Sequence, residues 1–220
     1  MTAAQAARTC SRVFGPLVVR YDARVLTPRP WTLLQSRWAA ELATQAAAGP
    51  ILELCAGAGQ IGLAAAVLTG RTLVQVEADP VAAGYAVTNA ALVGLAGQVD
   101  VRNGRIDTTL AAGERFPIIL ADPPYLPTAD VTRWPEDPVA AIDGGTDGLD
   151  VVRVCLQVAG RHLAPGGALL LQVAGQTQAF AVIAHLDRTT NLGLTHRETR
   201  HHDPNRAVML ITGGVPAVFR

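Results

Sequence analysis

The sequence of 220 residues lacks lysine altogether and contains only three cysteines. Without lysine, neither Schiff-base chemistry nor the phosphate-binding lysine of a P-loop is available. Cys10, Cys55 and Cys155 stand far apart in the chain, which predicts reduced thiols and argues against a disulfide scaffold or a zinc site. No apolar run reaches the length of a membrane span, and the N-terminus lacks a signal-peptide pattern. We therefore predict a cytoplasmic protein without a metal site.

Net charge is also absent, because 18 arginines balance 18 acidic residues. A neutral chain does not favour binding of polyanions through bulk charge. The first 30 residues differ, since they carry five arginines and one acid, Asp22, for a net charge of +4. We expect residues 1–30 to form a solvated N-terminal arm; the alternative is a contact surface for an acidic partner. Residues 31–220 contain enough hydrophobic side chains for one core and are predicted to form a single domain.

Short apolar runs alternate with segments of helical periodicity from residue 51 onward. Strands are predicted at 51–54, 72–77, 99–101, 117–121, 168–173, 194–200 and 207–212. Helices are predicted over about 34–49, 61–68, 81–95, 149–163 and 176–186, with an irregular stretch over 122–147. This alternation predicts an α/β fold: a doubly wound, mostly parallel seven-stranded sheet with helices on both faces and a C-terminal antiparallel hairpin. Ligands of such sheets bind beyond the carboxyl ends of the strands.

A glycine-rich loop follows the first of these strands. The segment from Gly57 to Gly62 fits the pattern Gly-x-Gly-x-x-Gly, and Glu77 ends the next strand. The glycines let the backbone pass close to a ligand, and the acid can accept both hydroxyls of a ribose, which suits NAD and S-adenosylmethionine equally. Glu53 favours the second cofactor, because a carboxylate there would attract a cationic amine and repel a pyrophosphate; capping of the following turn is the alternative. Cys55 is expected to be a small residue beneath the ligand.

Asp122, Pro123, Pro124 and Tyr125 follow directly on the strongest predicted strand. Two prolines make a rigid turn and remove two N–H donors, so the aspartate oxygen and a turn carbonyl offer two acceptors at a fixed separation. Such a pair can hold a planar –NH2 group, while Tyr125 offers an aromatic face for its planar carrier. Drawing both N–H bonds toward acceptors localises the nitrogen lone pair for attack on a sulfonium methyl. The turn predicts methyl transfer to an amide or aminopyrimidine nitrogen; a purely structural turn is the alternative.

Two further segments are polar. The proline-rich stretch from Thr132 to Pro138 contains Trp134 and is predicted to be either a lid on the substrate side or a plain surface loop. His201, His202 and Asp203 lack the spacing of ligands that face one metal ion, and are predicted at the tip of the last hairpin.

Five segments of the chain together resemble the HemK-like protein-glutamine N(5)-methyltransferases. These are class I S-adenosylmethionine enzymes that modify the glutamine of the Gly-Gly-Gln loop in peptide-chain release factors. The resemblance extends from about Phe14 to Gly213. Leu26 to Thr32 is similar to the family's L-I-P-R-P-E/D-T, and Ala141 to Asp150 is similar to A-L-x-G-G-x-D-G-L-D. The remaining matches are Glu53–Gly59, Asp122–Tyr125 and Leu163–Gly167.

The resemblance implies S-adenosylmethionine as the cofactor and a protein glutamine, in a release factor, as the methyl acceptor. It implies a cofactor site made by Thr32, Glu53, Cys55, Gly57, Gly59, Glu77, Ile106 and Asp122. Ile106 stands where the family has the side chain that packs on adenine. The residues implied to hold the substrate amide are Asp122, Pro123, Pro124 and Tyr125.

Several positions depart from the family pattern. The family's turn begins with Asn, whereas Asp122, a residue common in enzymes that methylate base amines, stands here. Arg105 occupies the place of an adenine-binding acid, for which Asp107 or a backbone carbonyl could substitute. Trp31 and Leu33 replace two acids of the family pattern. Only about 25 residues precede Pro28, where bacterial members carry a helical domain. Three alternatives stay open: a methyltransferase of an exocyclic base amine in RNA or DNA, a nicotinamide-dependent oxidoreductase, and a cofactor-binding protein without turnover.

Overall fold

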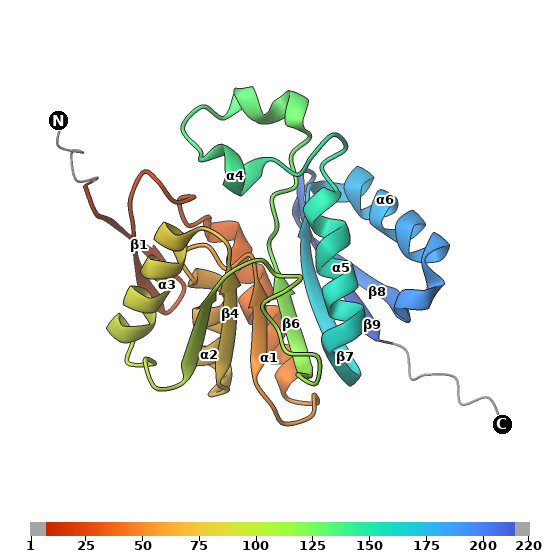
Figure 1. The fold of residues 1–220 in the computed structure, drawn as a ribbon, viewed down its shortest axis with the longest axis horizontal. Helices are drawn as coiled ribbons and strands as arrows, with labels where there is room; N and C mark the ends of the chain where they lie inside the picture. The colour runs from red at the N-terminus through yellow and green to blue at the C-terminus, as the bar shows by residue number, and fades with distance from the viewer. Residues whose placement is uncertain (1–7, 214–220) are drawn as a thin grey trace.

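The computed structural model describes residues 8–213, in which a seven-stranded sheet lies between helices and a separate two-stranded hairpin precedes it (Figure 1). The strands are β1 (Cys10–Phe14), β2 (Leu17–Tyr21), β3 (Ile51–Leu54), β4 (Leu73–Glu77), β5 (Val99–Asn103), β6 (Phe116–Ala121), β7 (Leu163–Val173), β8 (Leu194–Asp203) and β9 (Arg206–Gly213). The helices are α1 (Leu33–Ala43), α2 (Gln60–Thr69), α3 (Pro80–Leu92), α4 (Val139–Ile142), α5 (Asp150–His162) and α6 (Gly175–Arg188). Short 3-10 turns are η1 (Pro30–Thr32), η2 (Thr128–Arg133) and η3 (Thr190–Leu192). None of these helices has the length and apolar character needed to span a membrane.

The strands of the large sheet lie in the order β5-β4-β3-β6-β7-β9-β8. The strands from β5 to β7 are parallel to their neighbours, and β9 and β8 are added as an antiparallel hairpin. The predicted doubly wound, mostly parallel sheet with a C-terminal hairpin is confirmed. The chain runs outward from β3 to β5 and then returns to place β6 on the other side of β3. The switch point therefore lies between β3 and β6, and ligands of doubly wound sheets bind at this point.

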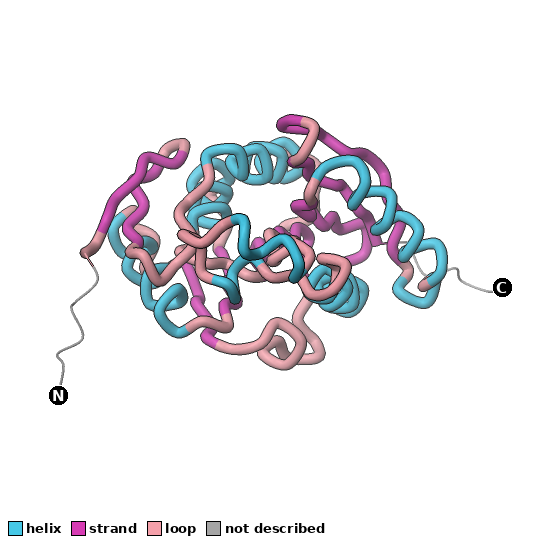
Figure 2. Tube along the Cα trace, turned by 90° about the horizontal axis from the view of Figure 1, so that it is seen from above, coloured by secondary structure: helices cyan, strands magenta, loops and turns pink. Residues whose placement is uncertain are grey.

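Helices cover both faces of the sheet, as predicted (Figure 2). The strand β6 is buried throughout, and its side chains alternate between two cores. Ile118 and Leu120 belong to the core that includes α1, α2 and α3, whereas Ile119 and Ala121 belong to the core that includes α5 and α6. A continuous apolar sequence of this kind is typical of a parallel strand buried on both faces. This burial fixes the position of the residue that follows β6, at the switch point.

The segment before the large sheet is folded against it. β1 and β2 form an antiparallel hairpin in which Phe14 and Val19 are buried. Asn89 of α3 donates to the backbone oxygen of Arg20 and accepts from its backbone N–H, so the hairpin is attached to the helix. In β2 buried Leu17 and Val19 alternate with exposed Val18 and Arg20, and this period of two gives the strand one buried face. Part of the predicted arm, residues 10–21, is therefore a hairpin that packs on the domain.

Residues 1–7 of that predicted arm lie outside the described residues, and the boundary at residue 30 stays a prediction. Several element boundaries also differ from the predicted ones. The first helix of the domain ends at Ala43 rather than near residue 49. β7 begins at Leu163, because that residue already pairs with Phe116 before the register between β6 and β7 shifts. The irregular stretch after β6 contains η2 and α4.

Candidate active site

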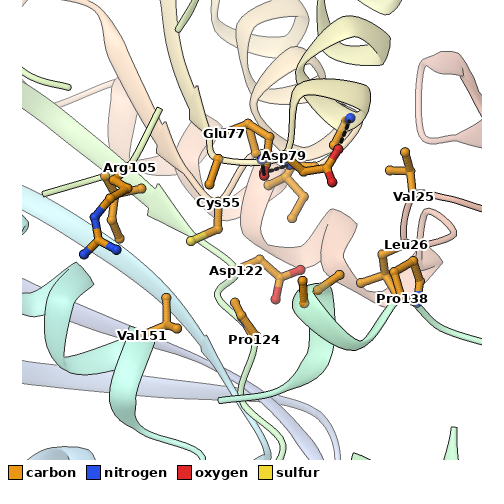
Figure 3. A pocket seen from close by; sticks show the side chains of 18 of the residues that line it. Val25, Leu26, Cys55, Glu77, Asp79, Arg105, Asp122, Pro124, Pro138 and Val151 are labelled. Carbon is orange, nitrogen blue, oxygen red and sulfur yellow. Dashed lines mark hydrogen bonds between the residues drawn. The ribbon is translucent and has the colours of Figure 1, made fainter. Parts of the chain in front are cut away.

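A cavity of about 320 Å³ opens at the switch point, beyond the carboxyl ends of β3, β4 and β6 (Figure 3). Its volume lies at the lower end of the range for small-molecule sites. The wall is built by the glycine loop, the loop after β5, the turn after β6, α4, α5 and the segment after β2. Predicted site residues in the wall are Cys55, Gly57, Glu77, Ile106, Asp122 and Pro124. Predicted site residues outside the wall are Thr32, Glu53, Gly59, Pro123 and Tyr125.

The Glu77 carboxylate, at the end of β4, is oriented by two backbone N–H groups. Its Oε2 accepts from the Gly57 nitrogen at 2.7 Å, and its Oε1 accepts from the Asp79 nitrogen at 2.8 Å. Gly57 has φ +55°, a conformation that favours glycine. Burial raises the pKa of Glu77 above its ordinary value. Each carboxylate oxygen keeps a free lone pair, so the group offers two fixed acceptors to a pair of neighbouring hydroxyls.

One side of the cavity is apolar. Ile106, which follows β5, lines it together with Val151 and Val154 of α5. Next to Ile106, the guanidinium of Arg105 and the carboxylate of Asp107 form an ion pair of 2.9 Å, and this contact lowers the pKa of Asp107. The acid thus neutralises the arginine that stands where the family pattern has an acid. This side of the cavity suits a flat, uncharged ring.

Cys55 lies in the wall of the cavity with φ +57°, the one positive φ at a non-glycine position in residues 8–213. Its thiol contacts the thiol of Cys155 in α5, and this contact together with burial raises the pKa of Cys55. A thiol with a raised pKa stays protonated at neutral pH and is a poor nucleophile. The geometry therefore supports the interpretation of Cys55 as a small lining residue.

Asp122 follows β6 directly, and its carboxyl group lies at the cavity (Figure 3). Within residues 8–213 no backbone or side-chain group donates a hydrogen bond to this carboxyl, and Pro123 and Pro124 cannot donate because they have no N–H. Burial raises the pKa of Asp122 to about 7. The carboxyl oxygens are therefore free to accept hydrogen bonds from a ligand.

The turn after Asp122 is supported by the glycine-rich segment that precedes α5. A side chain at Gly144 would overlap the carbonyl oxygen of Pro124, and one at Gly148 would overlap that of Tyr125. The Nε2 of Gln178 in α6 donates to the same Tyr125 oxygen at 3.0 Å and to the Gly148 oxygen at 3.1 Å. Two motifs that are separate in the sequence thus form one rigid corner, because glycine permits close packing of the two backbones.

Glu53 is buried at the end of β3 and does not line the cavity. Its Oε2 accepts from the Nε2 of Gln75 at 2.5 Å, and its carboxyl also accepts from the backbone N–H of Gly62. A Cβ at Gly62 would overlap the Glu53 carboxylate, which explains the third glycine of the loop. Burial raises the pKa of Glu53 to about 8. The expected role of Glu53 toward a cationic amine stays a prediction.

Two more predicted residues contribute indirectly to the wall. Thr32 is buried in η1, and its Oγ1 donates to the backbone oxygen of Arg29 at 2.9 Å, so it stabilises the Pro-Arg-Pro turn. Gly59 begins α2 with φ +86°, and a side chain there would overlap Gln75.

Several wall residues were missed in the sequence. They come from the segment after β2 and from the region of α4: Arg24, Val25, Leu26, Pro138, Ala140 and Ala141. Leu26 and Ala141 lie inside family motifs, which could have indicated them. Arg24 carries no local signal, since only a contact with α3 brings it to the cavity.

An aromatic and charged cluster lies beside the Asp122 corner. The guanidinium of Arg206, at the start of β9, lies 3.7 Å from the ring centroid of Trp31, and the guanidinium of Arg29 lies 5.7 Å from it. Arg29 forms an ion pair of 2.5 Å with Asp137. The charges of these arginines act on the Tyr125 phenol, whose pKa is nevertheless raised by burial. Four segments that are distant in the sequence therefore meet at the outer side of the Asp122 corner: those around residues 29–31, 125, 137 and 206.

Comparison with known proteins places this site in a family. A family model described as "Conserved hypothetical protein 95" matches residues 37–133. The release factor glutamine methyltransferase of Gloeobacter violaceus is 36% identical over 167 residues, which cover 73% of this chain and 58% of that protein. The release factor glutamine methyltransferase of Cereibacter sphaeroides is 33% identical over 201 residues, which cover 82% of this chain and 68% of that protein.

A crystal structure of a methyltransferase from Pyrococcus furiosus has the same fold, with a TM-score of 0.67, 22% identity and coverage of 91% of each chain. The chain spans 58% of the length of several of its curated relatives. The Cereibacter protein is matched over more than two thirds of its own length at 33% identity. On this similarity and on the motifs at the cavity, the chain belongs to the HemK family of release factor glutamine methyltransferases.

Proposed function

We propose that this chain transfers the methyl group of S-adenosylmethionine to the side-chain amide nitrogen of a protein glutamine, with a release factor as the substrate. The observation that supports this most is the free Asp122 carboxyl, which lies at the cavity on a rigid turn without donors of its own. A cytoplasmic location is part of the same proposal.

The charges of the cavity suit S-adenosylmethionine. Two arginines in the wall, Arg24 and Arg105, are each paired with an acid. Four acids lie in the wall: Glu77, Asp79, Asp107 and Asp122. A cavity with this excess of acids favours a ligand that carries a sulfonium and an amine, and disfavours the pyrophosphate of NAD. Glu77 would accept the ribose hydroxyls, and the apolar side at Ile106 would hold the adenine.

The chain's own residues would activate the acceptor amide by holding it. The bound cofactor supplies an electrophilic methyl group. The Asp122 carboxylate accepts one N–H of the amide, a carbonyl of the diproline turn accepts the other, and Tyr125 packs on the planar amide. Both bonds localise the nitrogen lone pair and aim it at the cofactor. Asp122 can also take the proton that the nitrogen loses, because its pKa of about 7 is close to neutral pH.

The charges on the acceptor side favour a protein over a nucleic acid. The arginines beside the corner are already paired, Arg29 with Asp137 and Arg206 with Asp203. These ion pairs reduce the net positive charge of the surface and so weaken the attraction of a phosphate backbone, although the donors that a pair leaves free can still bind a single small anion. The paired arginines leave an amphipathic surface around Trp31, which suits a flexible peptide loop. Methylation of a base amine is therefore the less favoured acceptor chemistry.

The test is transfer of methyl-labelled S-adenosylmethionine to three acceptors: a release factor with its Gly-Gly-Gln loop, the same factor with that Gln replaced by Glu, and total RNA. We expect label in the first acceptor alone, because Glu lacks the amide. Label in RNA alone would replace the proposal with the base-amine alternative. Binding of S-adenosylhomocysteine without transfer to either class would indicate a cofactor-binding protein without turnover, and a rise in melting temperature with NAD would indicate an oxidoreductase.

A further inference from the structure

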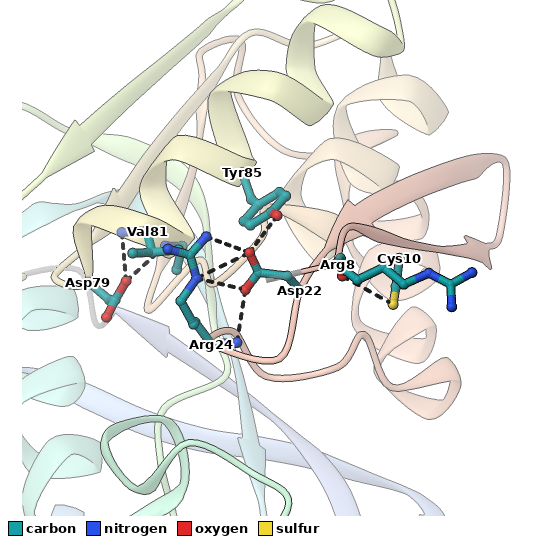
Figure 4. A network of polar contacts seen from close by, with 8 residues as sticks. Arg8, Cys10, Asp22, Arg24, Asp79, Val81 and Tyr85 are labelled. Atoms are coloured by element: carbon teal, nitrogen blue, oxygen red, sulfur yellow. Dashed lines mark hydrogen bonds and ion pairs between the residues drawn. The ribbon is translucent and has the colours of Figure 1, made fainter. Parts of the chain in front are cut away.

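Arg24 is held at the cavity by a buried acid (Figure 4). Its Nη2 lies 2.5 Å from Oδ2 of Asp22, and its Nε lies 3.1 Å from Oδ1 and 3.2 Å from Oδ2. Asp22 is fully buried, and its Oδ2 also accepts from the Tyr85 hydroxyl of α3 at 2.7 Å. These contacts hold the pKa of Asp22 well below its ordinary value, so the carboxylate stays charged and orients the guanidinium at all working pH values.

Part of the Arg24 guanidinium remains available. Asp22 takes Nε and Nη2, whereas Nη1 has no hydrogen-bond acceptor among residues 8–213. The side chain of Arg24 is 58% exposed, while that of Asp22 is 0% exposed. The acid is therefore enclosed by protein, whereas Arg24 is exposed and is one of the residues that line the cavity.

The two arginines of the wall lie at different places. Arg105 lies next to the apolar side of the cavity, with Ile106 and Val151. Arg24 directly precedes Val25 and Leu26, and these two residues lie across the cavity from Arg105 (Figure 3). Arg105 is paired with Asp107. Arg24 is thus the positively charged residue on the side of the cavity opposite the apolar side that suits a flat ring.

S-adenosylmethionine carries one carboxylate, on the amino-acid tail remote from its adenine. The four acids of the wall would repel this group, so it needs a cation on the side of the cavity away from Ile106. We propose that Arg24, oriented by Asp22 and Tyr85, binds the carboxylate of the cofactor. This inference rests on the proposed function, because it takes S-adenosylmethionine as the ligand.

The test compares two ligands that differ in the tail, by isothermal titration calorimetry. S-adenosylhomocysteine has the amino-acid tail, and 5′-methylthioadenosine has the same adenosine and thioether without it. We expect Arg24→Gln to weaken S-adenosylhomocysteine binding by about tenfold or more and to change 5′-methylthioadenosine binding less than twofold. The control Arg105→Gln removes the other wall arginine and should affect both ligands in the same proportion.

A second variant separates binding from folding, because Arg24→Gln leaves Asp22 buried without its partner. In the double variant Asp22→Asn with Arg24→Gln both charges are removed, and we expect the same loss confined to S-adenosylhomocysteine. Asp22→Asn alone keeps the Arg24 charge and should lose less than the double variant. Equal losses for both ligands, or no loss for either, in a folded double variant would overturn the role of Arg24. A wild-type protein that binds neither ligand would instead refute the proposed cofactor.

Discussion

Two carboxyl groups stand at the ends of neighbouring strands, the buried Glu53 on β3 and the half-buried Asp122 after β6, and their surroundings differ. The strands pair in parallel, and burial raises the pKa of both groups, to about 8 for Glu53 and about 7 for Asp122. Glu53 accepts from Gln75 and from the Gly62 backbone, whereas Asp122 accepts from no group among residues 8–213. A raised pKa is therefore common to both carboxyl groups, and the supply of hydrogen-bond donors and the exposure to the cavity distinguish them.

This difference indicates that one carboxyl group supports the fold and that the other is available to a ligand. A carboxyl group that the protein leaves without donors at a cavity can accept hydrogen bonds from a ligand. Glu53 is satisfied by the protein and stabilises the glycine loop. Asp122 is left for an incoming donor, which fits its proposed role as a hydrogen-bond acceptor for the substrate amide.

Removal of the Asp122 carboxyl should have the largest effect. We expect Asp122→Ala to lower the rate of methyl transfer by about 10²–10³-fold, since it removes one of two groups that orient the amide. Binding of S-adenosylhomocysteine should stay within a few fold, measured by calorimetry. The control Asp187→Ala removes an exposed acid of α6 and should leave transfer unchanged. An Asp122→Ala protein that fails to fold would assign the turn a structural role.

A methyl group at Gly62 should have the next largest effect, on stability. Its Cβ would overlap the Glu53 carboxylate and lie 3.0 Å from Cδ1 of Leu73, so we expect Gly62→Ala to lower the free energy of unfolding by about 1–3 kcal/mol. Urea denaturation measures this change. Gly84→Ala in α3 is the matched control, because a Cβ there meets no atom within 4 Å and alanine favours a helix by about 1 kcal/mol. Equal effects of both substitutions would contradict the support role of Glu53.

The pH dependence of transfer should show the smallest effect. Asp122 has a pKa raised to about 7, so the carboxyl is ionised above this pH and protonated below it. Protonation removes the negative charge and turns one carboxyl oxygen into a donor, and kcat/KM should therefore fall as pH decreases through 7, approaching about tenfold per pH unit. Asp122→Asn keeps an amide oxygen as acceptor at every pH and should abolish this fall. A variant that retains the wild-type profile would show that another group titrates.

The features that could be predicted from the sequence depend on residues that are neighbours in the chain. The apolar residues of β6 and the two prolines after it indicated a buried strand and a rigid turn, because both depend on neighbouring residues. The positive φ values of Gly57 and Gly59 follow in the same way from a tight loop. Glu53 was placed at the right strand end, but its partner Gln75 belongs to the next strand, so local sequence could not identify it.

The sequence was thus enough to predict the doubly wound sheet, the glycine loop and the Asp-Pro-Pro-Tyr turn. Each of these arises from the periodicity or the backbone restrictions of adjacent residues. The remaining features depended on folding. Arg24 reaches the cavity because Asp22 meets Tyr85, 63 positions later in the chain, and Trp31 meets Arg206 only through the C-terminal hairpin. Contacts of this kind join segments whose separation in the chain carries no information about their distance in space, and only packing around a common core brings them together.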